Sequence, residues 1–419
     1  MIDIESQIMF QKLTQLPPDH RIADMKKRLE VALLLVFGSS LLAQAPPTRA
    51  RGGRGGSATP PAYEVRSDRT VTFRLGAPEA STVQVSGDFG AAAAMTKDQD
   101  GMWTATIGPL RPAIYNYTFT VNGVRVLDPA NPWTGTADRT PGSSLFEVKA
   151  DSPALYDPQP VPHGSLHVHY YNSKKFGGAL RMLYVYTPPG YETSSVRYPS
   201  LYLMHGAGGN ESSWVIQGRA NIILDNLIAQ GTAKPMIVVM PYGRPNESTT
   251  LNPFASDPDP LPSDPAAALS RAFFLGAAVF PNDAVEDVVP YIDKNYRTAS
   301  GADNRAIAGM SMGGNQTLAI GLNNLDAFHY LGAFSAVIFN PTIEKDYALA
   351  FADVAATNKK LKVFYVYCGD ADMLFASNKS FHELLDQKKI KHTFVESKEG
   401  HVWRNWRDYL VDFAPRLFR

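Results

Sequence analysis

The pattern of hydrophobic positions changes near residue 160. Before it, short runs such as 70–75 and 114–121 alternate between apolar and polar residues, which is the period of a strand with one buried face. After it, unbroken apolar runs such as 236–240 are separated by amphipathic segments such as 283–296. Apolar strands separated by helices indicate a parallel sheet covered on both faces. We therefore expect a small all-β domain followed by an α/β domain.

Turn signals separate the alternating runs of the first region. They fall at Gln99–Gly101, Gly108–Pro109 and Asn122–Gly123, and such residues are typical of tight connections between strands. Several short strands at this spacing predict a β-sandwich over residues 62–150. The same pattern makes residues 151–164 a linker to the α/β domain, which covers residues 165–419.

The first 61 residues show neither pattern. From Met25 a basic stretch leads into the apolar run 31–43, and Ala43–Ala45 resembles the cleavage site of a signal peptide. The run is too short to span a membrane comfortably, and a buried helix is the alternative. We predict that residues 1–45 are an upstream segment and a signal peptide starting at Met25. Residues 46–61, rich in Pro, Gly and Arg, are predicted to be a linker, and the protein is expected to be secreted or periplasmic.

Composition excludes several classes of partner. Forty basic residues balance 40 acidic ones in the 419-residue chain, so neither nucleic acid nor an anionic membrane is expected as a partner. The single cysteine, Cys368, lies in an apolar run, which favours a buried structural thiol. No Cys/His group has the spacing of a zinc site, so no metal is predicted. The sequence does not indicate an oligomeric state.

The strongest chemical signal is the G-x-S-x-G motif over residues 309–313. Residues 305–308 are expected to form a short buried strand, and a helix is expected to start at Gly314. A serine at the apex of a tight strand-to-helix turn is presented to solvent, and it needs small residues on either side. Ser311 is therefore predicted to be a nucleophile. The alternative is a packing turn whose serine has no chemical role.

A serine nucleophile needs a base, an acid that orients the base, and donors for the oxyanion. His401 follows a predicted strand and opens the last helix, whereas His382 and His392 lie inside a helix and at a strand start. His401 is therefore the expected base. Asp370 and Asp372 both follow a predicted strand and precede the histidine. The order serine, aspartate, histidine is that of α/β-hydrolases.

The oxyanion donors and the substrate contacts are predicted from neighbouring segments. The N–H of Met312 follows the nucleophile, and the N–H of Ala207 lies in a glycine-rich segment after a predicted strand, where backbone can approach a substrate closely. A plain tight turn is the alternative for the second segment. Trp214, Tyr242 and Phe254 lie next to predicted strand ends, so each is a candidate to stack on an aromatic acyl group, with core packing as the alternative.

These motifs together resemble carbohydrate esterase family 1 and its wider esterase-D group, which includes feruloyl, acetyl xylan and siderophore (enterochelin) esterases. The resemblance implies an α/β-hydrolase fold with a mainly parallel sheet and no cofactor. It also implies a triad of Ser311, His401 and Asp372, because the acid of the family is the last residue of a G-x-x-D. Five segments carry the resemblance: Thr187–Tyr191, Leu203–Asn210, Gly309–Gly314, Cys368–Asp372 and Gly400–His401.

Residues 62–150 are similar to early-set immunoglobulin-like modules related to family 48 carbohydrate-binding modules. Exposed aromatic residues bind glucan in some of these modules, so Trp103 and Trp133 are candidate sugar contacts here, with packing preferred for both. Four segments carry this similarity: residues 83–89, 100–103, 115–123 and 128–132.

Together with the predicted signal peptide, the two resemblances imply a secreted serine carboxylesterase. It would hydrolyse hydroxycinnamoyl (feruloyl) esters of plant cell-wall xylan, or small aromatic esters, through an acyl-enzyme. Acetyl xylan esterase and siderophore esterase are alternatives, because the acyl pocket is built from loops whose paths the sequence does not define. A carbohydrate-binding protein without catalysis is the alternative from a different class.

Overall fold

The computed structural model describes most of the chain after the predicted signal peptide and linker, and residues 60–419 form one compact unit. The predicted signal peptide, the linker over 46–61 (apart from its last residue) and the candidate substrate contact Phe254 lie outside the described residues. No helix within the described ranges is long and apolar enough to cross a membrane. Those ranges are residues 61–137, 141–244, 282–338 and 343–419.

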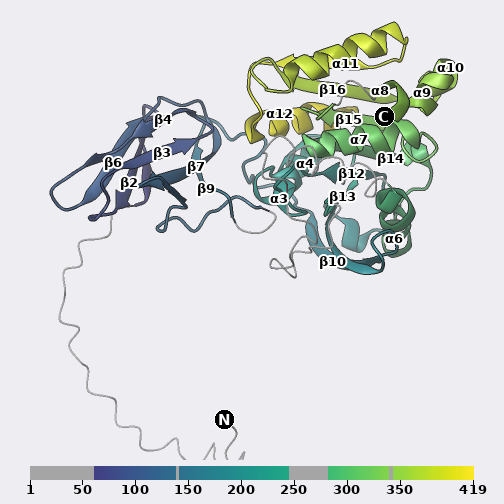
Figure 1. Cartoon of the computed structure of the whole chain (residues 1–419). Coiled ribbons are helices and arrows are strands. Elements are labelled where there is room, and N and C mark those ends of the chain that lie inside the picture. The colour runs from purple at the N-terminus through teal and green to yellow at the C-terminus, as the bar shows by residue number, and fades with distance from the viewer. Residues whose placement is uncertain (1–60, 138–140, 245–281, 339–342) are drawn as a thin grey trace, which may run out of the picture. The chain divides into compact units, whose positions relative to one another are not determined.

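The first described part is a sandwich of two antiparallel sheets (Figure 1). The strand orders are β1-β2-β6-β5 and β4-β3-β7-β8, and β9 also pairs with β7. Inward-facing aromatic and branched residues such as Phe73 and Phe119 fill the space between the sheets. The turn at Asn122–Gly123 has positive φ at both residues, which suits the hairpin that joins β7 and β8. The strands are β1 (Tyr63–Val65), β2 (Val71–Gly76), β3 (Val83–Gly87), β4 (Gly90–Ala94), β5 (Thr96–Lys97), β6 (Met102–Ile107), β7 (Ala113–Val121), β8 (Val124–Val126) and β9 (Ser144–Val148).

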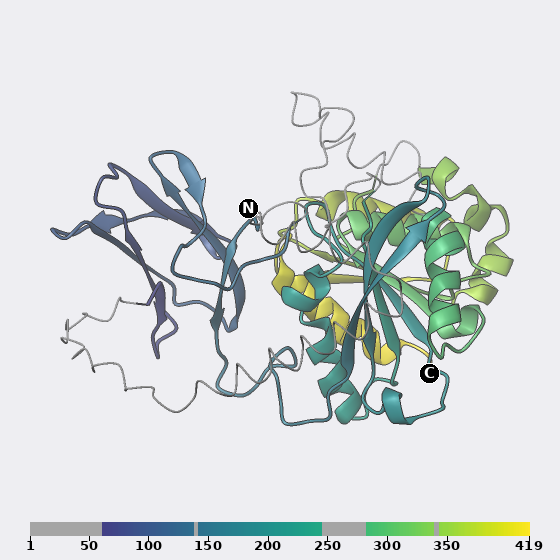
Figure 2. The same ribbon diagram turned by 90° about the horizontal axis from the view of Figure 1, so that it is seen from below.

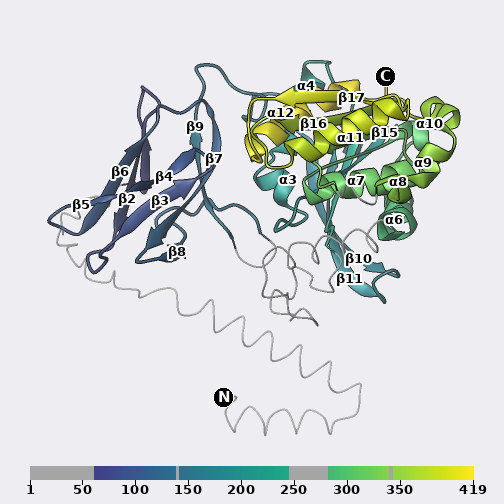
Figure 3. The same ribbon diagram turned by 45° about the horizontal axis from the view of Figure 1, so that its top comes forward.

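The second part contains an eight-stranded sheet in the order β10-β11-β13-β12-β14-β15-β16-β17. The six neighbouring strands β13, β12, β14, β15, β16 and β17 are parallel. At the other end of the sheet from β17, β11 is antiparallel to both of its neighbours, β13 and β10 (Figure 3). The predicted α/β fold with a mainly parallel sheet is therefore confirmed. The strands are β10 (Ser165–Ser173), β11 (Ala179–Thr187), β12 (Ser200–Met204), β13 (Ile237–Pro241), β14 (Arg305–Met310), β15 (Tyr330–Phe334), β16 (Val363–Gly369) and β17 (Thr393–Ser397).

Helices cover both faces of this sheet (Figure 2). The apolar residues of α6, α7 and α11 pack on one face, and those of α3, α4 and α12 pack on the other. The α-helices are α3 (Ser213–Ile216), α4 (Ala220–Ala229), α6 (Val289–Asn295), α7 (Met312–Asn323), α8 (Ile343–Asp346), α9 (Ala348–Ala352), α10 (Val354–Lys360), α11 (Phe375–Gln387) and α12 (Trp403–Phe413). Single turns are η1 (Tyr191–Thr193), the π-helical η2 (Ala284–Val288), η3 (Ala302–Asn304) and η5 (Ala414–Arg416).

The two covered faces explain why the strands of this part show no polar alternation. In β14, Ile307 packs against the helices of one face, while Ala306 and Ala308 pack against those of the other. All three are fully buried, because successive side chains of a strand point to opposite faces. A polar residue at any of these positions would have no water on either side.

The parallel strands bring the candidate chemistry to one edge of the sheet. Ser311 directly follows β14, Asp372 comes shortly after β16, and His401 lies between β17 and α12. The carboxyl ends of neighbouring parallel strands meet at the same edge, which is where open α/β sheets build their sites.

Candidate active site

Ser311 occupies a strained turn between β14 and α7. Its φ of 58° and ψ of −116° lie outside the regions that a residue with a side chain ordinarily adopts. Two backbone hydrogen bonds hold the turn: Ser311 N–H donates to the Phe334 carbonyl at 2.8 Å, and Val337 N–H donates to the Ser311 carbonyl at 3.1 Å. The strand-to-helix turn predicted from the motif is therefore present, and it turns the serine away from the strand.

The glycines that flank the serine are required by close backbone approach. A Cβ atom on Gly309 would lie 2.5 Å from the Gly313 carbonyl oxygen. A Cβ on Gly313 would lie 2.6 Å from the carbonyl oxygens of both Met204 and His205. These separations are shorter than any real contact of a Cβ atom, so strand and helix can cross here only without side chains.

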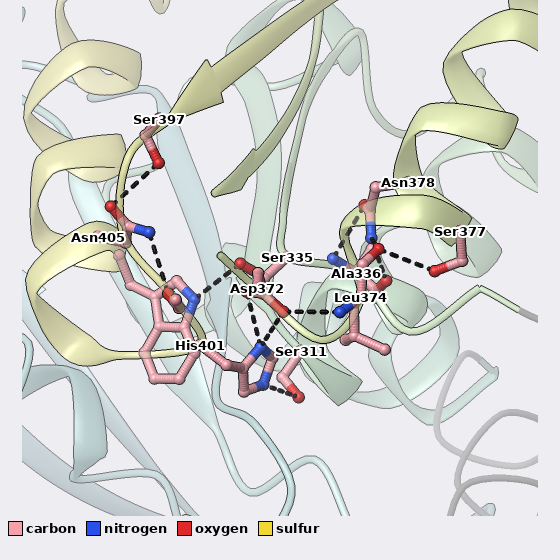
Figure 4. Close-up of polar contacts among 12 residues, drawn as sticks. Ser311, Ser335, Ala336, Asp372, Leu374, Ser377, Asn378, Ser397, His401 and Asn405 are labelled. Carbon is pink, nitrogen blue, oxygen red and sulfur yellow. Dashed lines mark hydrogen bonds and ion pairs between the residues drawn. The ribbon is translucent and has the colours of Figure 1, made fainter. Parts of the chain in front are cut away.

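A chain of hydrogen bonds joins Ser311, His401 and Asp372 (Figure 4). The Asp372 oxygens lie 2.9 and 3.1 Å from His401 Nδ1, so this nitrogen carries the proton and donates to the carboxylate. His401 Nε2 is then free to accept the hydroxyl proton of Ser311, whose Oγ lies 3.0 Å away. The three predicted residues therefore meet in the arrangement that nucleophilic catalysis requires.

The surroundings of Asp372 keep its carboxyl ionised. Burial raises the pKa of Asp372, but the hydrogen bond and charge of His401, the Leu374 N–H at 2.9 Å and the Ser335 hydroxyl together lower it below its usual value. An ionised carboxylate can hold the imidazole in one orientation and stabilise its positive form.

Ser335 is a member of this cluster that the sequence analysis did not single out. It is fully buried directly after β15, and its φ is 45°. Its Oγ accepts a hydrogen bond from Trp406 Nε1 at 3.2 Å, and its hydroxyl lowers the pKa of Asp372. The Trp406 ring in turn packs edge-to-face on His401, with centroids 4.9 Å apart. The signal in the sequence was a serine that ends a buried strand at the same sheet edge.

Asp370, His382 and His392, the alternatives for the acid and the base, have partners outside the triad. Asp370 pairs with the exposed Lys398 at 2.8 Å, and His382 Nδ1 lies 2.7 Å from His392 Nε2. With Asp386, these two histidines are the only group among the described residues that could hold a metal ion. Their nitrogens are at hydrogen-bond distance, whereas ligands of one tetrahedral zinc ion lie about 3.3 Å apart. The present geometry therefore does not favour a metal there.

Both predicted oxyanion donors belong to segments next to the nucleophile. Met312 is the first residue of α7, so its N–H has no partner within the helix. Ala207 lies in the segment that abuts the serine, since a Cβ on Gly206 would be 3.2 Å from Ser311 Cβ. His205 supports this segment: its Nδ1–H donates to the Gly206 carbonyl at 2.8 Å. Two N–H groups beside the serine can stabilise a developing oxyanion.

A pocket of about 360 Å³ adjoins Ser311 and His401. Its volume falls in the range of small-molecule sites. Its α/β wall includes glycine backbone and the apolar residues Met310, Val402, Trp403 and Trp406. Its other wall comes from the β-sandwich, including the connection between β8 and β9, and contains Asp88, Asn116, Arg125, Thr136 and Ser143. One wall is therefore suited to an apolar group and the other to a polar one.

Two of the predicted substrate contacts are packing residues. Trp214 and Tyr242 are each 1% exposed. The Trp214 Nε1–H donates to the Met204 carbonyl at 2.9 Å, and the Tyr242 ring stacks on His205 at 5.8 Å. Their side chains support the loops of the site and present no surface to a ligand, so the packing alternative replaces the expectation of acyl stacking. Phe254 lies outside the described residues.

The candidate sugar contacts of the sandwich have different surroundings. Trp103 is buried, and its Nε1–H donates to the Ala77 carbonyl at 2.9 Å, which is a packing role. Trp133 is half-buried beneath the Arg219 guanidinium, 5.2 Å from the ring centre, beside a hollow of about 350 Å³. Trp133 remains a candidate sugar contact, and carbohydrate binding by the sandwich remains a prediction.

Two isosteric substitutions test which of the two aspartates, Asp372 or Asp370, is the acid of the triad. Asp372→Asn should lower kcat by roughly 10²–10⁴-fold, because an amide stabilises the wrong orientation or tautomer of His401. Asp370→Asn is the matched control and should stay within about twofold of wild type, since an exposed ion pair contributes little. Steady-state kinetics on a soluble ester measures both. Greater damage from Asp370→Asn would contradict the assignment.

Ser335→Ala tests whether the Ser335 hydroxyl stabilises the ionised carboxyl of Asp372. Losing the Ser335 hydroxyl should raise the pKa of Asp372 and lower kcat about tenfold, since a polar contact to a charged group contributes about 1.5–3 kcal/mol. Because the pKa of Asp372 is lower in the folded than in the unfolded protein, its ionised carboxyl stabilises the folded state at pH values above the unfolded-state pKa. This stabilisation is lost as the pH falls through the folded-state pKa. The Tm deficit of the variant should therefore be largest at neutral pH and shrink in acid.

The matched control for this variant is Ser377→Ala. The Ser377 hydroxyl donates to the Leu374 carbonyl at 3.0 Å and has no hydrogen bond to the carboxylate among the described residues. It should leave both kcat and the pH dependence of Tm near wild type. A Tm deficit in Ser335→Ala that is independent of pH would show that the hydroxyl does not act through the charge of Asp372.

Comparison with known proteins agrees with this geometry. The chain is 32% identical over 369 residues to the "Endo-1,4-beta-xylanase/feruloyl esterase" of Xylanibacter ruminicola. The aligned region is 85% of this chain and 46% of that protein, so the chain spans less than half the length of this curated relative.

Solved structures share the fold. A ferulic acid esterase from Anaeromyces mucronatus, in complex with ferulic acid, is 25% identical with a TM-score of 0.51, covering 64% of this chain and 96% of that one. The enterochelin esterase of Shigella flexneri is 16% identical with a TM-score of 0.61, covering 85% and 95%. The latter likeness concerns the fold alone.

Residues 173–417 match the family described as "Putative esterase". The predicted resemblance to carbohydrate esterase family 1 and its relatives is thus confirmed for the α/β part. Since the match covers more than half of its residues, the chain belongs to this esterase family.

Proposed function

We propose that the protein is a serine carboxylesterase that hydrolyses hydroxycinnamoyl (feruloyl) esters of plant cell-wall xylan. The observation that carries this proposal is the unbroken hydrogen-bond chain from Asp372 through His401 to Ser311. It lies beside a pocket large enough for an aromatic acyl group. No step of the proposed reaction needs a metal or an organic cofactor.

The first half of the reaction forms an acyl-enzyme. His401 Nε2 takes the hydroxyl proton as Ser311 Oγ attacks the ester carbonyl carbon, and the carbonyl oxygen becomes an oxyanion. The N–H groups of Ala207 and Met312 donate to that oxyanion. Asp372 stabilises the imidazolium, which then gives its proton to the departing alcohol oxygen as the C–O bond breaks.

The second half releases the acid. A water molecule gives a proton to His401 Nε2 and attacks the acyl carbon, so a second oxyanion forms in the same position. The bond to Ser311 Oγ then breaks, and the imidazolium returns its proton to the serine. The same three side chains and two N–H groups therefore serve both halves of the reaction.

The choice of a feruloyl ester rests on the pocket and on the relatives. The wall with Met310, Trp403 and Trp406 suits an aromatic acyl group, and the wall with Asp88 and Asn116 suits the hydroxyl groups of a sugar. The Xylanibacter protein and the Anaeromyces structure carry the words feruloyl esterase and ferulic acid esterase in their names. We also propose a secreted or periplasmic location, on the basis of the apolar run after Met25.

Side-by-side kinetics tests both levels of the proposal. Methyl ferulate or a feruloylated arabinoxylan oligomer should be cleaved with kcat/KM at least about tenfold above that for acetylated xylan or a catecholate siderophore, which corresponds to about 1.4 kcal/mol. Ser311→Ala should lower kcat on the preferred ester by roughly 10⁴–10⁶-fold while remaining folded. Hydrolysis that remains with Ser311→Ala measures the background rate, which is subtracted from the rate of the wild-type enzyme.

The two parts of this test fail independently. If acetylated xylan or the siderophore were preferred by the same margin, the feruloyl choice would be rejected and the serine esterase retained. If folded Ser311→Ala kept near-normal turnover, the nucleophile would be another group. If the wild-type protein cleaved none of these esters, the non-catalytic carbohydrate-binding alternative would gain support.

A further inference from the structure

The histidine of the site lies in a short loop that contacts the β-sandwich. Residues 398–402 connect β17 to α12 and carry His401. Within the loop's own surroundings, Asn405 Nδ2–H donates to the Gly400 carbonyl at 3.0 Å, and Ser397 Oγ–H donates to Asn405 Oδ1 at 3.1 Å. Charged residues before and after His401 in the sequence contact residues of the sandwich.

Glu399, two residues before the histidine, links the loop to the sandwich. Arg111 Nε forms an ion pair with Glu399 Oε1 at 2.7 Å, and Arg404 Nη2 donates to Glu399 Oε2 at 3.1 Å. Arg111 lies between β6 and β7 of the sandwich. Glu399 therefore joins one arginine from each part of the protein.

Arg404, three residues after the histidine, makes the second link. Its Nη1 lies 3.2 Å from Asp88 Oδ2, and its Nη2 donates to the Asp88 carbonyl at 2.7 Å. The guanidinium also lies 4.5 Å from the ring centre of Tyr115. The side chains of Arg404 and Asp88 are only 8% and 12% exposed, so solvent screens this pair weakly. Burial raises the pKa of Asp88 and the Arg404 charge opposes this shift.

A third arginine fixes α12 against the sandwich next to this network. Arg407 is buried, and its Nη1 and Nη2 donate to the carbonyl oxygens of Gln217 and Ile114 at 2.7 and 2.9 Å. Ile114 belongs to β7. Buried charges with this many specific partners define one relative position of two elements more than they add stability.

We propose that the network Arg111–Glu399–Arg404–Asp88 is a clamp through which the β-sandwich positions His401. The sandwich then takes part in catalysis on every ester, small soluble ones included. This inference rests on the proposed function, because it assigns positioning residues to the same histidine. In this role the four residues act through the loop, although Asp88 also lines the pocket.

The expected size of the effect follows from the geometry of the triad. His401 must hold bonds of 2.9 Å to Asp372 and 3.0 Å to Ser311 at once. A misplacement of about 1 Å costs on the order of 10²-fold in rate. Because the bonds of Asn405 remain when the clamp is broken, we expect a smaller loss, of about tenfold in kcat.

Arg111→Gln is the variant that tests the clamp. Arg111 is half-exposed on the sandwich and does not line the pocket, so the variant should fold. With methyl ferulate, kcat should fall about tenfold while KM changes little. Arg111→Lys keeps the charge and should recover most of the rate. Glu399→Gln should lower kcat about as much as Arg111→Gln does. The double variant, with both substitutions, should have a kcat no lower than that of Glu399→Gln alone.

Lys398→Gln is the matched control. Lys398 lies in the same loop, but it is 87% exposed and pairs with Asp370 rather than with the sandwich. It should keep wild-type kcat. Wild-type kcat in both clamp variants, an equal loss in the control, or fully additive losses in the double variant would each overturn the clamp.

Hydrogen exchange separates failure of the clamp from failure of the proposed function. Amide exchange over residues 398–404 should be faster in Arg111→Gln than in wild type or Lys398→Gln. If the wild-type protein cleaves no ester, the function fails, and exchange alone then decides whether the loop is clamped. Unchanged exchange in Arg111→Gln would overturn the clamp whatever the activity.

Discussion

The hydrogen bond between His401 Nε2 and Ser311 Oγ, 3.0 Å long, is the contact on which the rest of the site depends. It joins a turn after β14 to a loop after β17, and these strands are separated in the sheet by β15 and β16. Residues from all four strand ends support it: Ser311, Ser335, Asp372 and His401. A parallel sheet makes this possible because it delivers each strand end to the same edge.

The parts of this arrangement that follow from local physics could be predicted from the sequence. The elbow requires glycine at 309 and 313, so its motif is visible in five residues. Asp372 and His401 could be assigned because they follow apolar strands in a characteristic order. Distinguishing Asp372 from Asp370 needed the resemblance to a family, since the two carboxylates have the same local context.

What could not be predicted depends on contacts between distant segments. Ser335 is an ordinary serine in the sequence, and its role arises only where β15 meets Trp406. Trp214 and Tyr242 follow strand ends as a substrate contact would, but their rings turn into the core because the adjacent loops need support. Likewise, Glu399 and Arg404 look like solvated charges until the sandwich is placed beside them.

The central claim is that Ser311 becomes acylated, and trapping the intermediate tests it most directly. The protein would be mixed with methyl ferulate, quenched in acid within the first turnovers and digested for mass spectrometry. The account predicts a feruloyl adduct on the peptide that contains Ser311, and no adduct in Ser311→Ala. An adduct on another residue, or efficient hydrolysis by the Ser311→Ala protein, would contradict it.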